Sequence, residues 1–249
     1  IESYFCPDST ATYVGRLKHL PHLIGAHSYW TNTPVDFMRE TRKRVAKACG
    51  ERGIKFWQTE ICIMSNDKEI GGGSGYDHSM KTALYVARVI HHDLVYANAE
   101  SWSWWRAAGG DYRDGLLRVY SNDNWKTGWA IDSKLLWALG NYSRFVRPGA
   151  QRFTMVRQGC DMADADDSCT DPNGVMCSAY RNTNDKWVVV AINYSEEAKT
   201  VNFTVKGSTP IEWRLYRTSD TSAESLAPVG NSKKETLLAP RSITTFVEP

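Results

Sequence analysis

Up to about residue 150, the apolar positions of the chain follow strand and helix periods in turn. Apolar runs of strand length cover residues 23–30, 54–64 and 99–105. Stretches with apolar residues at helical spacing follow at residues 33–53, 76–96 and 133–145. Strands that alternate with amphipathic helices predict parallel βα units.

Residue types at the helix ends support these boundaries. In the first long helix we expect Thr33 as the N-cap, Pro34 as the first helical residue and Asp36 in the first turn. Gly53 is a natural stop for that helix. Residues 147–149, Arg-Pro-Gly, break the last one.

From residue 150 onward the pattern changes to short apolar stretches separated by Asn, Gly, Pro and Ser turns. We expect strands at residues 153–157, 175–181, 187–194, 200–205, 211–217 and 242–247. This spacing predicts an antiparallel β-sandwich without helices. The chain is thus expected to hold an α/β domain of residues 1–149 and a sandwich side domain of residues 150–249.

Charge and length exclude several classes of protein. The 249 residues carry 30 basic and 28 acidic side chains, so no strong field favours nucleic acid or an anionic membrane as a partner. No apolar run reaches the roughly 20 residues of a membrane span. A closed (β/α)₈ barrel needs eight strands and about 250 residues of its own. The α/β domain is therefore either a small open sheet or the C-terminal part of a barrel.

Aromatic residues are abundant, with ten Trp and 12 Tyr. Eight of the ten Trp precede residue 150. Flat aromatic faces pack well against the apolar faces of sugar rings, which favours a carbohydrate site. The alternative is that most of these rings belong to the core.

The predicted strand over residues 54–64 carries a carboxylate near its C-terminal end. Period two places Phe56, Gln58 and Glu60 on one face. An acid at the end of an otherwise apolar parallel strand occupies the position where barrel enzymes keep catalytic groups. The alternative is that Glu60 anchors an arginine structurally.

The neighbouring strands end in further candidate residues. His27 and Tyr29 lie at the C-terminal end of the first strand, and a Tyr hydroxyl there would orient a carboxylate and keep it ionised. Trp104 and Trp105 end the third strand. A structural histidine is the alternative for His27.

Other patterns do not support a second kind of site. The glycine-rich residues 71–75 lack the Gly-Lys-Ser/Thr ending of a phosphate loop, so we expect a flexible active-site loop. His91 and His92 are consecutive on a helix and cannot share a metal. No metal site or cofactor motif is found. The loop with Asp111 and Arg113 is polar enough to contact sugar hydroxyls.

Cysteines and sequons bear on the compartment. Cys160, Cys169 and Cys177 lie close together in sequence, where one short disulfide is expected. Asn-X-Ser/Thr sequons occur at positions 141, 193 and 202. Together these features favour an exported protein.

Four segments in this order resemble glycoside hydrolase family 30. They are residues 23–30 (LIGAHSYW), 57–60 (WQTE), the Trp-rich residues 101–105 and residues 139–149 (LGNYSRFVRPG). The family includes enzymes related to glucosylceramidase, endo-xylanases and endo-β-1,6-galactanases. The resemblance implies the C-terminal part of a TIM barrel, about strands six to eight, followed by a β-sandwich.

The same resemblance implies a role for each candidate residue. Glu60 matches the nucleophile of a retaining β-glycosidase at the end of the seventh strand. His27 and Tyr29 match sixth-strand residues beside it, and Trp104 and Trp105 match the eighth-strand rim that stacks on sugar. The family's acid/base glutamate follows an asparagine, and this chain contains no Asn-Glu pair.

We therefore expect part of a retaining hydrolase of the endo type, acting on a polysaccharide such as β-1,6-galactan. The missing N-terminal half would supply the acid/base and complete the barrel, so residues 1–249 alone should not form a closed one. The alternatives are a non-catalytic carbohydrate-binding protein and a structural sandwich module. The linker of residues 147–150 is short, so the sandwich is expected to pack on the barrel part.

Overall fold

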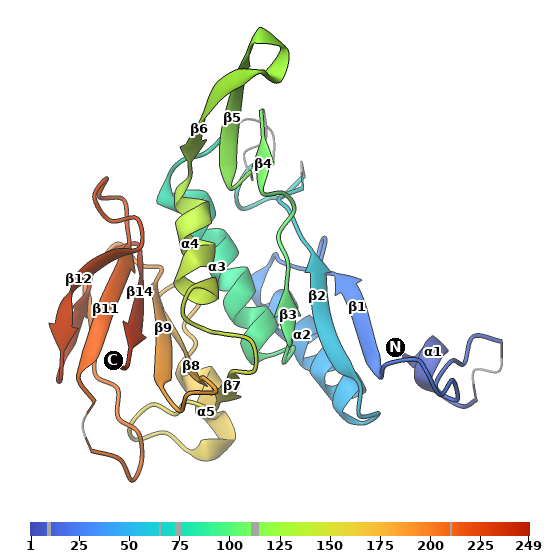
Figure 1. Cartoon of the computed structure of the whole chain (residues 1–249). Helices are drawn as coiled ribbons and strands as arrows, with labels where there is room; N and C mark the ends of the chain where they lie inside the picture. Colours follow the sequence, from blue (N-terminus) through green and yellow to red (C-terminus); the bar gives the residue numbers. More distant parts are fainter. Residues whose placement is uncertain (9–10, 65, 73–75, 111–114, 210) are drawn as a thin grey trace. The chain divides into compact units, whose positions relative to one another are not determined.

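The computed structural model describes residues 1–8, 11–64, 66–72, 76–110, 115–209 and 211–249 (Figure 1). The chain divides into two compact units. The first consists of residues 1–73 and 92–106, and the second of residues 74–91 and 107–249. Residues 80–91 of the helix α3 (Met80–Val95) belong to the second unit, and residues 92–95 belong to the first.

The first unit is built around a parallel sheet in the order β1-β2-β3. These strands are β1 (Leu23–His27), β2 (Lys55–Glu60) and β3 (Ser101–Trp102). The helix α2 (Val35–Gly50) connects β1 to β2, and the end of α3 leads into β3. The prediction of parallel βα units is therefore confirmed. A short helix, α1 (Glu2–Phe5), precedes them.

The boundaries of α2 differ from the prediction. Pro34 is the N-cap, with φ −66° and ψ 165°, so the helix begins at Val35 rather than after a Thr33 cap. An extended ψ at Pro34 delays the first helical turn by one residue. The helix ends at Gly50, and Gly53 then adopts a φ of +60°, which a side chain disfavours.

Burial alternates along β2 because only one face of this sheet meets helices. Phe56 is buried in a cluster with Cys49 of α2 and with Ile54, Ala97 and Ala99. Ile24 of β1 packs against the same cluster. The opposite face of β2 is exposed at every second residue, including Trp57. The predicted period of two is thus confirmed.

The second unit contains the sandwich. Its larger sheet is antiparallel in the order β12-β11-β14-β9-β8-β7. The strands are β7 (Gln151–Phe153), β8 (Val175–Arg181), β9 (Trp187–Asn193), β11 (Trp213–Thr218), β12 (Ala227–Ser232) and β14 (Ser242–Val247). A two-stranded sheet of β10 (Lys199–Val201) and β13 (Thr236–Leu238) shares its apolar core, in which Leu238 and Phe246 are fully buried.

The sandwich confirms the antiparallel prediction but is not free of helix. A 3₁₀ turn, η2 (Met162–Asp164), and the short helix α5 (Ala165–Ser168) lie between β7 and β8. The sequence analysis also gave no strand for β12 or β13. Pro228 and two turn-forming residues interrupt β12, and its pairing with β11 contains a register shift that hides the period.

The last predicted helix packs directly on the sandwich. This helix is α4 (Lys134–Ser143), capped by Ser133, whose Oγ accepts a hydrogen bond from Leu136 N. Asn141 is buried, and its Nδ2 donates to Thr218 Oγ1 at 2.7 Å. Thr245 Oγ1 donates to Asn141 Oδ1 at 2.9 Å. This helix and the sandwich therefore form part of one unit, and packing of the sandwich on the parallel sheet stays a prediction.

Two of the three sequons are structural. Asn141 makes the bonds just described, and buried Asn193 donates from Nδ2 to Glu197 O and Ala239 O. Their amide nitrogens are thus engaged inside the fold, whereas Asn202 is exposed. The expected disulfide is also absent, because Cys160, Cys169 and Cys177 are thiols.

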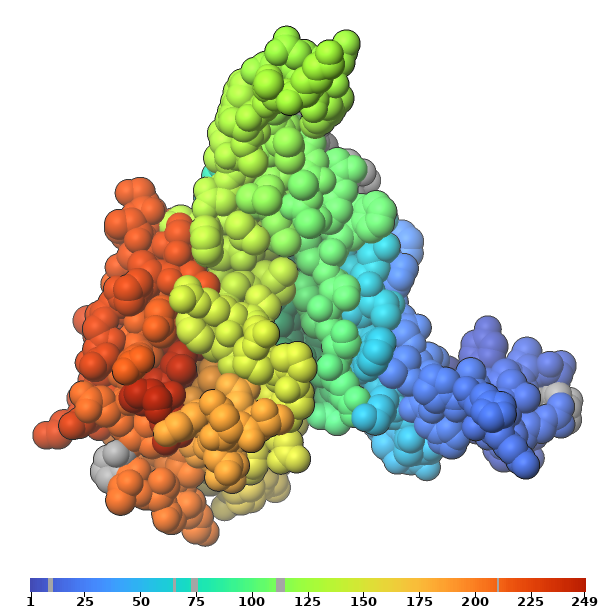
Figure 2. Space-filling model, viewed as in Figure 1, coloured from blue at the N-terminus to red at the C-terminus, as the bar shows by residue number. Residues whose placement is uncertain are grey.

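Three short strands within residues 106–132, a segment expected to be a loop, form a small sheet in the order β4-β5-β6. Its strands are β4 (Ala108–Gly109), β5 (Leu117–Asn122) and β6 (Thr127–Asp132), with the 3₁₀ turn η1 (Asp123–Trp125) at the tip. β5 and β6 form an antiparallel hairpin, called the β5–β6 hairpin below. Within the second unit it projects beyond α3 and α4 (Figure 2). Asp111 and Arg113 lie outside the described residues.

Across the described parts of the chain, no helix combines the length and the apolar character that a bilayer crossing requires. Within those same parts, no three His, Cys, Asp or Glu side chains gather in a way that would hold a metal ion. Gly73 to Gly75 of the predicted active-site loop lie outside the described residues.

Candidate active site

Three of the predicted site residues meet at the C-terminal ends of β1 and β2. The hydroxyl of Tyr29 donates a hydrogen bond to Glu60 Oε1 at 2.7 Å. His27 Nδ1 lies 3.5 Å from the same oxygen. The rings of His27 and Tyr29 are in edge contact, with centroids 5.6 Å apart. Glu60 is half-buried, so its carboxylate is held from one side and open on the other.

A bulge in the sheet brings these side chains together. The parallel register runs regularly to Ala26, which pairs with Gln58, and then shifts so that His27 pairs with Glu60. Without the shift His27 would pair with Thr59, and strict alternation would place Glu60 on the opposite face of the sheet from His27. The extra residue of β2 therefore turns Glu60 toward His27 and Tyr29.

Tyr29 is suited to act as a permanent hydrogen-bond donor. Burial raises the pKa of its phenol well above the usual value, and the hydrogen bonds with Glu60 and Cys62 raise it further. The phenol thus keeps its proton throughout the range in which proteins function. A neutral donor on Oε1 fixes the direction of the Glu60 carboxylate.

The third strand brings aromatic rings to the same edge of the sheet. Backbone pairing between β2 and the chain after β3 continues past the strands themselves, with Ser103 N bonded to Gln58 O and Trp105 N bonded to Ile61 O. Trp104 stacks on Trp102 with centroids 6.0 Å apart and planes 12° from parallel. Trp105 is exposed. Both predicted tryptophans therefore lie near the end of the strand that carries Glu60.

Gln58 is a site residue that the sequence analysis gave no role. It is fully buried, and its Nε2 donates to Ser28 Oγ at 2.9 Å and to Glu60 O at 3.0 Å. One side chain thereby ties the turn after β1 to the last residue of β2. The signal available in the sequence was an amide two residues before the acid, on the buried face of an apolar strand.

Arg42 and Asp93 form a buried ion pair that the sequence analysis also missed. Arg42 Nε donates to Asp93 Oδ1 at 2.7 Å, and the two side chains are 3% and 1% exposed. The other carboxylate oxygen of Asp93 accepts a hydrogen bond from Trp102 Nε1 at 2.8 Å. The pair therefore joins α2, the end of α3 and β3.

The rest of the Arg42 guanidinium holds the turn after β1. It donates to Thr31 O at 2.9 Å, to Thr31 Oγ1 at 2.5 Å and to Asn32 Oδ1 at 2.8 Å. Thr31 Oγ1 in turn donates to Ser28 O at 2.7 Å. Tyr29 sits within this braced turn, so the ion pair fixes the backbone that presents the Tyr29 hydroxyl to Glu60.

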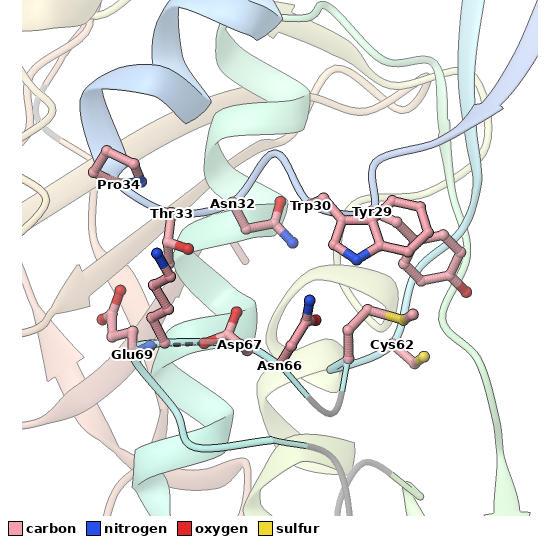
Figure 3. A pocket seen from close by; sticks show the side chains of 11 residues that line it. Tyr29, Trp30, Asn32, Thr33, Pro34, Cys62, Asn66, Asp67 and Glu69 are labelled. Atoms are coloured by element: carbon pink, nitrogen blue, oxygen red, sulfur yellow. Dashed lines mark hydrogen bonds between the residues drawn. The ribbon is translucent and has the colours of Figure 1, made fainter.

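A cavity of about 560 Å³ opens beside Tyr29. Its walls come from two loops, residues 29–34 after β1 and residues 62–69 after β2, and Figure 3 shows Tyr29 and Trp30 at one end with Asp67 and Glu69 at the other. Asp67 Oδ1 accepts hydrogen bonds from Glu69 N at 3.0 Å and Ile70 N at 2.9 Å, so the second loop is braced by its own side chain. The volume falls in the usual range of small-molecule sites, about 300–1,000 Å³.

Two family models match most of the chain. The model described as O-Glycosyl hydrolase family 30 matches residues 1–120. The model described as Glycosyl hydrolase family 30 beta sandwich domain matches residues 164–246. The chain belongs to glycoside hydrolase family 30. The resemblance found in the sequence is thus confirmed, and so is the expectation of part of a TIM barrel followed by a β-sandwich.

Similar proteins come from several bacteria. Glucuronoxylanase XynC of Bacillus subtilis strain 168 is 28% identical over 236 residues, which are 90% of this chain and 45% of that protein. A conserved exported protein from Bacteroides fragilis has a solved structure that matches with a TM-score of 0.78 and 30% identity, over 95% of this chain and 48% of that one.

A structure below 25% identity adds evidence on the fold. The GH30 endoxylanase from Clostridium papyrosolvens C71 matches with a TM-score of 0.63 and 21% identity, over 98% of this chain and 54% of that one. This family 30 chain therefore spans about half the length of the relatives it matches. The roles of Glu60, His27, Tyr29, Trp104 and Trp105 stay predictions, as does the domain boundary between residues 149 and 150.

Proposed function

We propose that the complete protein is a retaining β-glycoside hydrolase in which Glu60 is the nucleophile. The observation that carries this proposal is the hydrogen bond from Tyr29 to Glu60, at the C-terminal ends of two parallel strands in a glycoside hydrolase family 30 chain. A nucleophilic carboxylate must be ionised, oriented and open to substrate on one side. In Glu60, Tyr29 and His27 contact one carboxylate oxygen, which orients the group, and the rest of the Glu60 side chain is partly exposed to solvent.

The reaction proceeds in two displacements. In the first, a Glu60 oxygen attacks the anomeric carbon, the glycosidic C–O bond breaks, and a second carboxylic acid gives its proton to the departing oxygen. In the second, water attacks the anomeric carbon and gives its proton to the second carboxylate, which lost its own proton in the first step. The bond between the anomeric carbon and Glu60 then breaks. The second carboxyl group stands about 5–5.5 Å from the first in retaining enzymes. We propose that it comes from the N-terminal half of the barrel.

The role of Tyr29 is to position Glu60 and to stabilise its charge before attack. The hydroxyl donates to Oε1 without losing its proton, because its pKa is raised. His27 lies against the same oxygen and limits the rotation of the carboxylate. Trp104 and Trp105 supply flat apolar surface for a sugar ring at the neighbouring strand end.

We propose a polysaccharide as the substrate, cleaved within the chain. The cavity of about 560 Å³ beside Tyr29 is large enough to hold sugar of the chain next to the reacting unit. Glucuronoxylan is the first substrate to test, since the similar Bacillus subtilis proteins are named glucuronoxylanases. β-1,6-Galactan is the second. Such a substrate lies outside the cell, and export of the protein is part of the proposal.

Covalent labelling tests the nucleophile directly. The complete protein is incubated with 2-deoxy-2-fluoro glycosyl fluorides of xylobiose and of galactose, and the product is mapped by peptide mass spectrometry. We expect one sugar adduct, on Glu60, and none on a Glu60→Gln variant. An adduct on a different carboxylate would reject Glu60 as the nucleophile. A protein that binds these glycans but never forms an adduct would be a carbohydrate-binding protein instead.

A further inference from the structure

The β5–β6 hairpin carries a stack of planar groups on one of its faces. Arg118 and Tyr120 of β5 share this face with Trp129 and Ile131 of β6, since Tyr120 pairs with Trp129 and Arg118 with Ile131 across the strands. The rings of Tyr120 and Trp129 are stacked, with centroids 4.9 Å apart and planes 11° from parallel. The hairpin thus presents an ordered aromatic surface.

At the inner end of the stack, the Arg118 guanidinium lies between two tyrosine rings. The Arg118 guanidinium lies 4.8 Å from the Tyr120 centroid and 5.5 Å from that of Tyr76. Tyr76 itself is fixed to the hairpin, because its hydroxyl donates to Ile131 O at 3.0 Å and accepts from Arg118 N at 3.0 Å. Tyr120 therefore contacts both the Trp129 indole and the Arg118 guanidinium.

The outer end of the stack is open. Trp129 lies on β6, the edge strand of the β4-β5-β6 sheet. All six residues of β6 are exposed, and Trp129 itself is 53% exposed. One face of its indole is occupied by Tyr120, so the exposed area is the other face and the ring edge. The stack therefore ends in a held, accessible aromatic plane.

We propose that Trp129 is a stacking platform for a sugar unit of a polysaccharide. The proposal rests on the glycoside hydrolase function proposed above. In this arrangement a pyranose ring packs its C–H face on the exposed face of the Trp129 indole. Exposed aromatic patches of this kind mark binding surfaces.

The chemistry of the face favours a glycan over a protein partner. The face combines flat rings with hydrogen-bonding groups, among them Thr127 and Asn122, which pair with each other near the tip. Ile131 is its one aliphatic residue. Sugars offer an apolar ring face bordered by hydroxyls and match this mixture, and the chain belongs to a family of glycoside hydrolases.

Binding measurements on matched variants test the platform. The complete protein, with Glu60→Gln to prevent hydrolysis, is run by native electrophoresis through gels containing glucuronoxylan or β-1,6-galactan. We expect one of these polysaccharides to retard it, and Trp129→Ala to weaken the apparent affinity about tenfold. Trp129→Phe should restore most of the retardation, since it keeps a flat ring.

Trp125 supplies the control. It lies on the same hairpin and is 73% exposed, but among the described residues it makes no ring stack. Trp125→Ala should change the retardation less than twofold. Equal losses for both variants, or unchanged retardation of Trp129→Ala, would overturn the platform.

The thermal unfolding of each variant separates the remaining explanation. If another part of the complete protein covers Trp129, Trp129→Ala will lower the melting temperature and leave retardation unchanged, which also overturns the proposal. Because the assay measures binding in a hydrolysis-deficient background, it is independent of fluoro-sugar labelling. A failure of the proposed catalytic role at Glu60 is therefore distinguishable from a failure of the platform.

Discussion

At the scale of single residues, the Tyr29–Glu60 contact concentrates the proposed chemistry. A carboxylate that accepts one hydrogen bond from a neutral phenol is held in one orientation. Its other oxygen is not engaged by that phenol, which leaves it available to attack. The two side chains therefore have separable roles, one reacting and one positioning.

Replacing the reacting carboxylate gives the first prediction. Glu60→Gln in the complete protein should lower kcat by at least ~10³-fold, because the covalent step is removed and only binding and electrostatic stabilisation are left. The amide is nearly isosteric, so the melting temperature should hardly change. Steady-state kinetics and thermal unfolding measure the two effects. A variant with near-normal turnover and a lowered melting temperature would support the structural-anchor alternative.

The positioning residue gives the second prediction. Tyr29→Phe should lower kcat by roughly 10²-fold, less than Glu60→Gln, because one orienting hydrogen bond is lost and the nucleophile itself is retained. The KM should change much less than kcat, because the lost hydrogen bond acts on the reacting carboxylate rather than on bound sugar. An unchanged kcat would argue against this role.

At the scale of elements, the Arg42–Asp93 pair sets how α2, α3 and β3 meet around the turn that carries Tyr29. Both charges are buried, and each makes further hydrogen bonds: Arg42 to the turn, Asp93 to Trp102. A buried pair of this type contributes little net stability by itself, but removing one partner strands the other charge in a poorly solvated place.

The third prediction follows from that asymmetry. Asp93→Asn should lower the free energy of unfolding by about 3–5 kcal/mol, because Arg42 is left without its counter-charge. Asp36→Asn on α2, the helix that carries Arg42, is the control: Asp36 pairs with Arg39 at 3.0 Å but is largely exposed, so its loss should cost about 1 kcal/mol or less. Urea unfolding compares the two, and similar losses would contradict the buried-pair argument.

The β5–β6 hairpin illustrates a second constraint at this scale. Gly128 pairs with Ser121 across the strands, and a Cβ at Gly128 would lie 2.1 Å from the carbonyl oxygen of Tyr120. No side chain fits so close to backbone atoms. The close approach of the two strands next to the Tyr120–Trp129 stack therefore requires glycine at this point.

At the scale of the whole molecule, two buried phenols make the free energy of unfolding vary with pH in the alkaline range. Burial raises the pKa of Tyr180 from 10.0 to about 12, and it also raises the pKa of Tyr142 well above the usual value. Both residues lie in the second unit. In the folded state the protons are held more tightly than in the unfolded chain, so their linkage stabilises the fold fully below pH 10.

The fourth prediction gives the sign and the range. Stability should fall as pH rises from 10.0 toward about 12, because the unfolded chain releases the Tyr180 proton before the folded one does. Tyr180→Phe should be less stable at neutral pH, by about 1 kcal/mol for the lost hydrogen bond to Ser178. Its decline over the alkaline range should be shallower than that of the parent protein. Parallel declines in melting temperature would contradict the assignment.

The parallel sheet of the first unit gives the fifth prediction. Among the described residues, β1 and β3 are edge strands, and Trp57 on β2 is exposed. Open parallel strands with exposed aromatic surface favour association. Residues 1–249 expressed alone should therefore self-associate or need further polypeptide to pack on this sheet. A monodisperse monomer with one cooperative unfolding transition, measured by light scattering and calorimetry, would show otherwise.

Features that depend on residues close together in the chain could be predicted from the sequence alone. Alternation and helical spacing predicted β8 and β14 at their observed bounds and placed the other main elements within a few residues, because burial on one face imposes those periods. The same reasoning placed Glu60, His27 and Tyr29 at strand ends, and the ordered motifs identified the family.

Tertiary structure decided what depends on residues far apart in the chain. The bulge opposite His27 and Glu60 arises from pairing between two strands and leaves no periodic mark on either one. Arg42 and Asp93 are 51 residues apart, and each alone is typical of an exposed helix face. The hairpin of residues 117–132 was missed because β5 is half-buried over residues 117–121 and β6 is exposed throughout, so neither strand shows the alternation that burial imposes. Periodicity reports what a segment buries, whereas register and long-range pairing are set only when the segments meet.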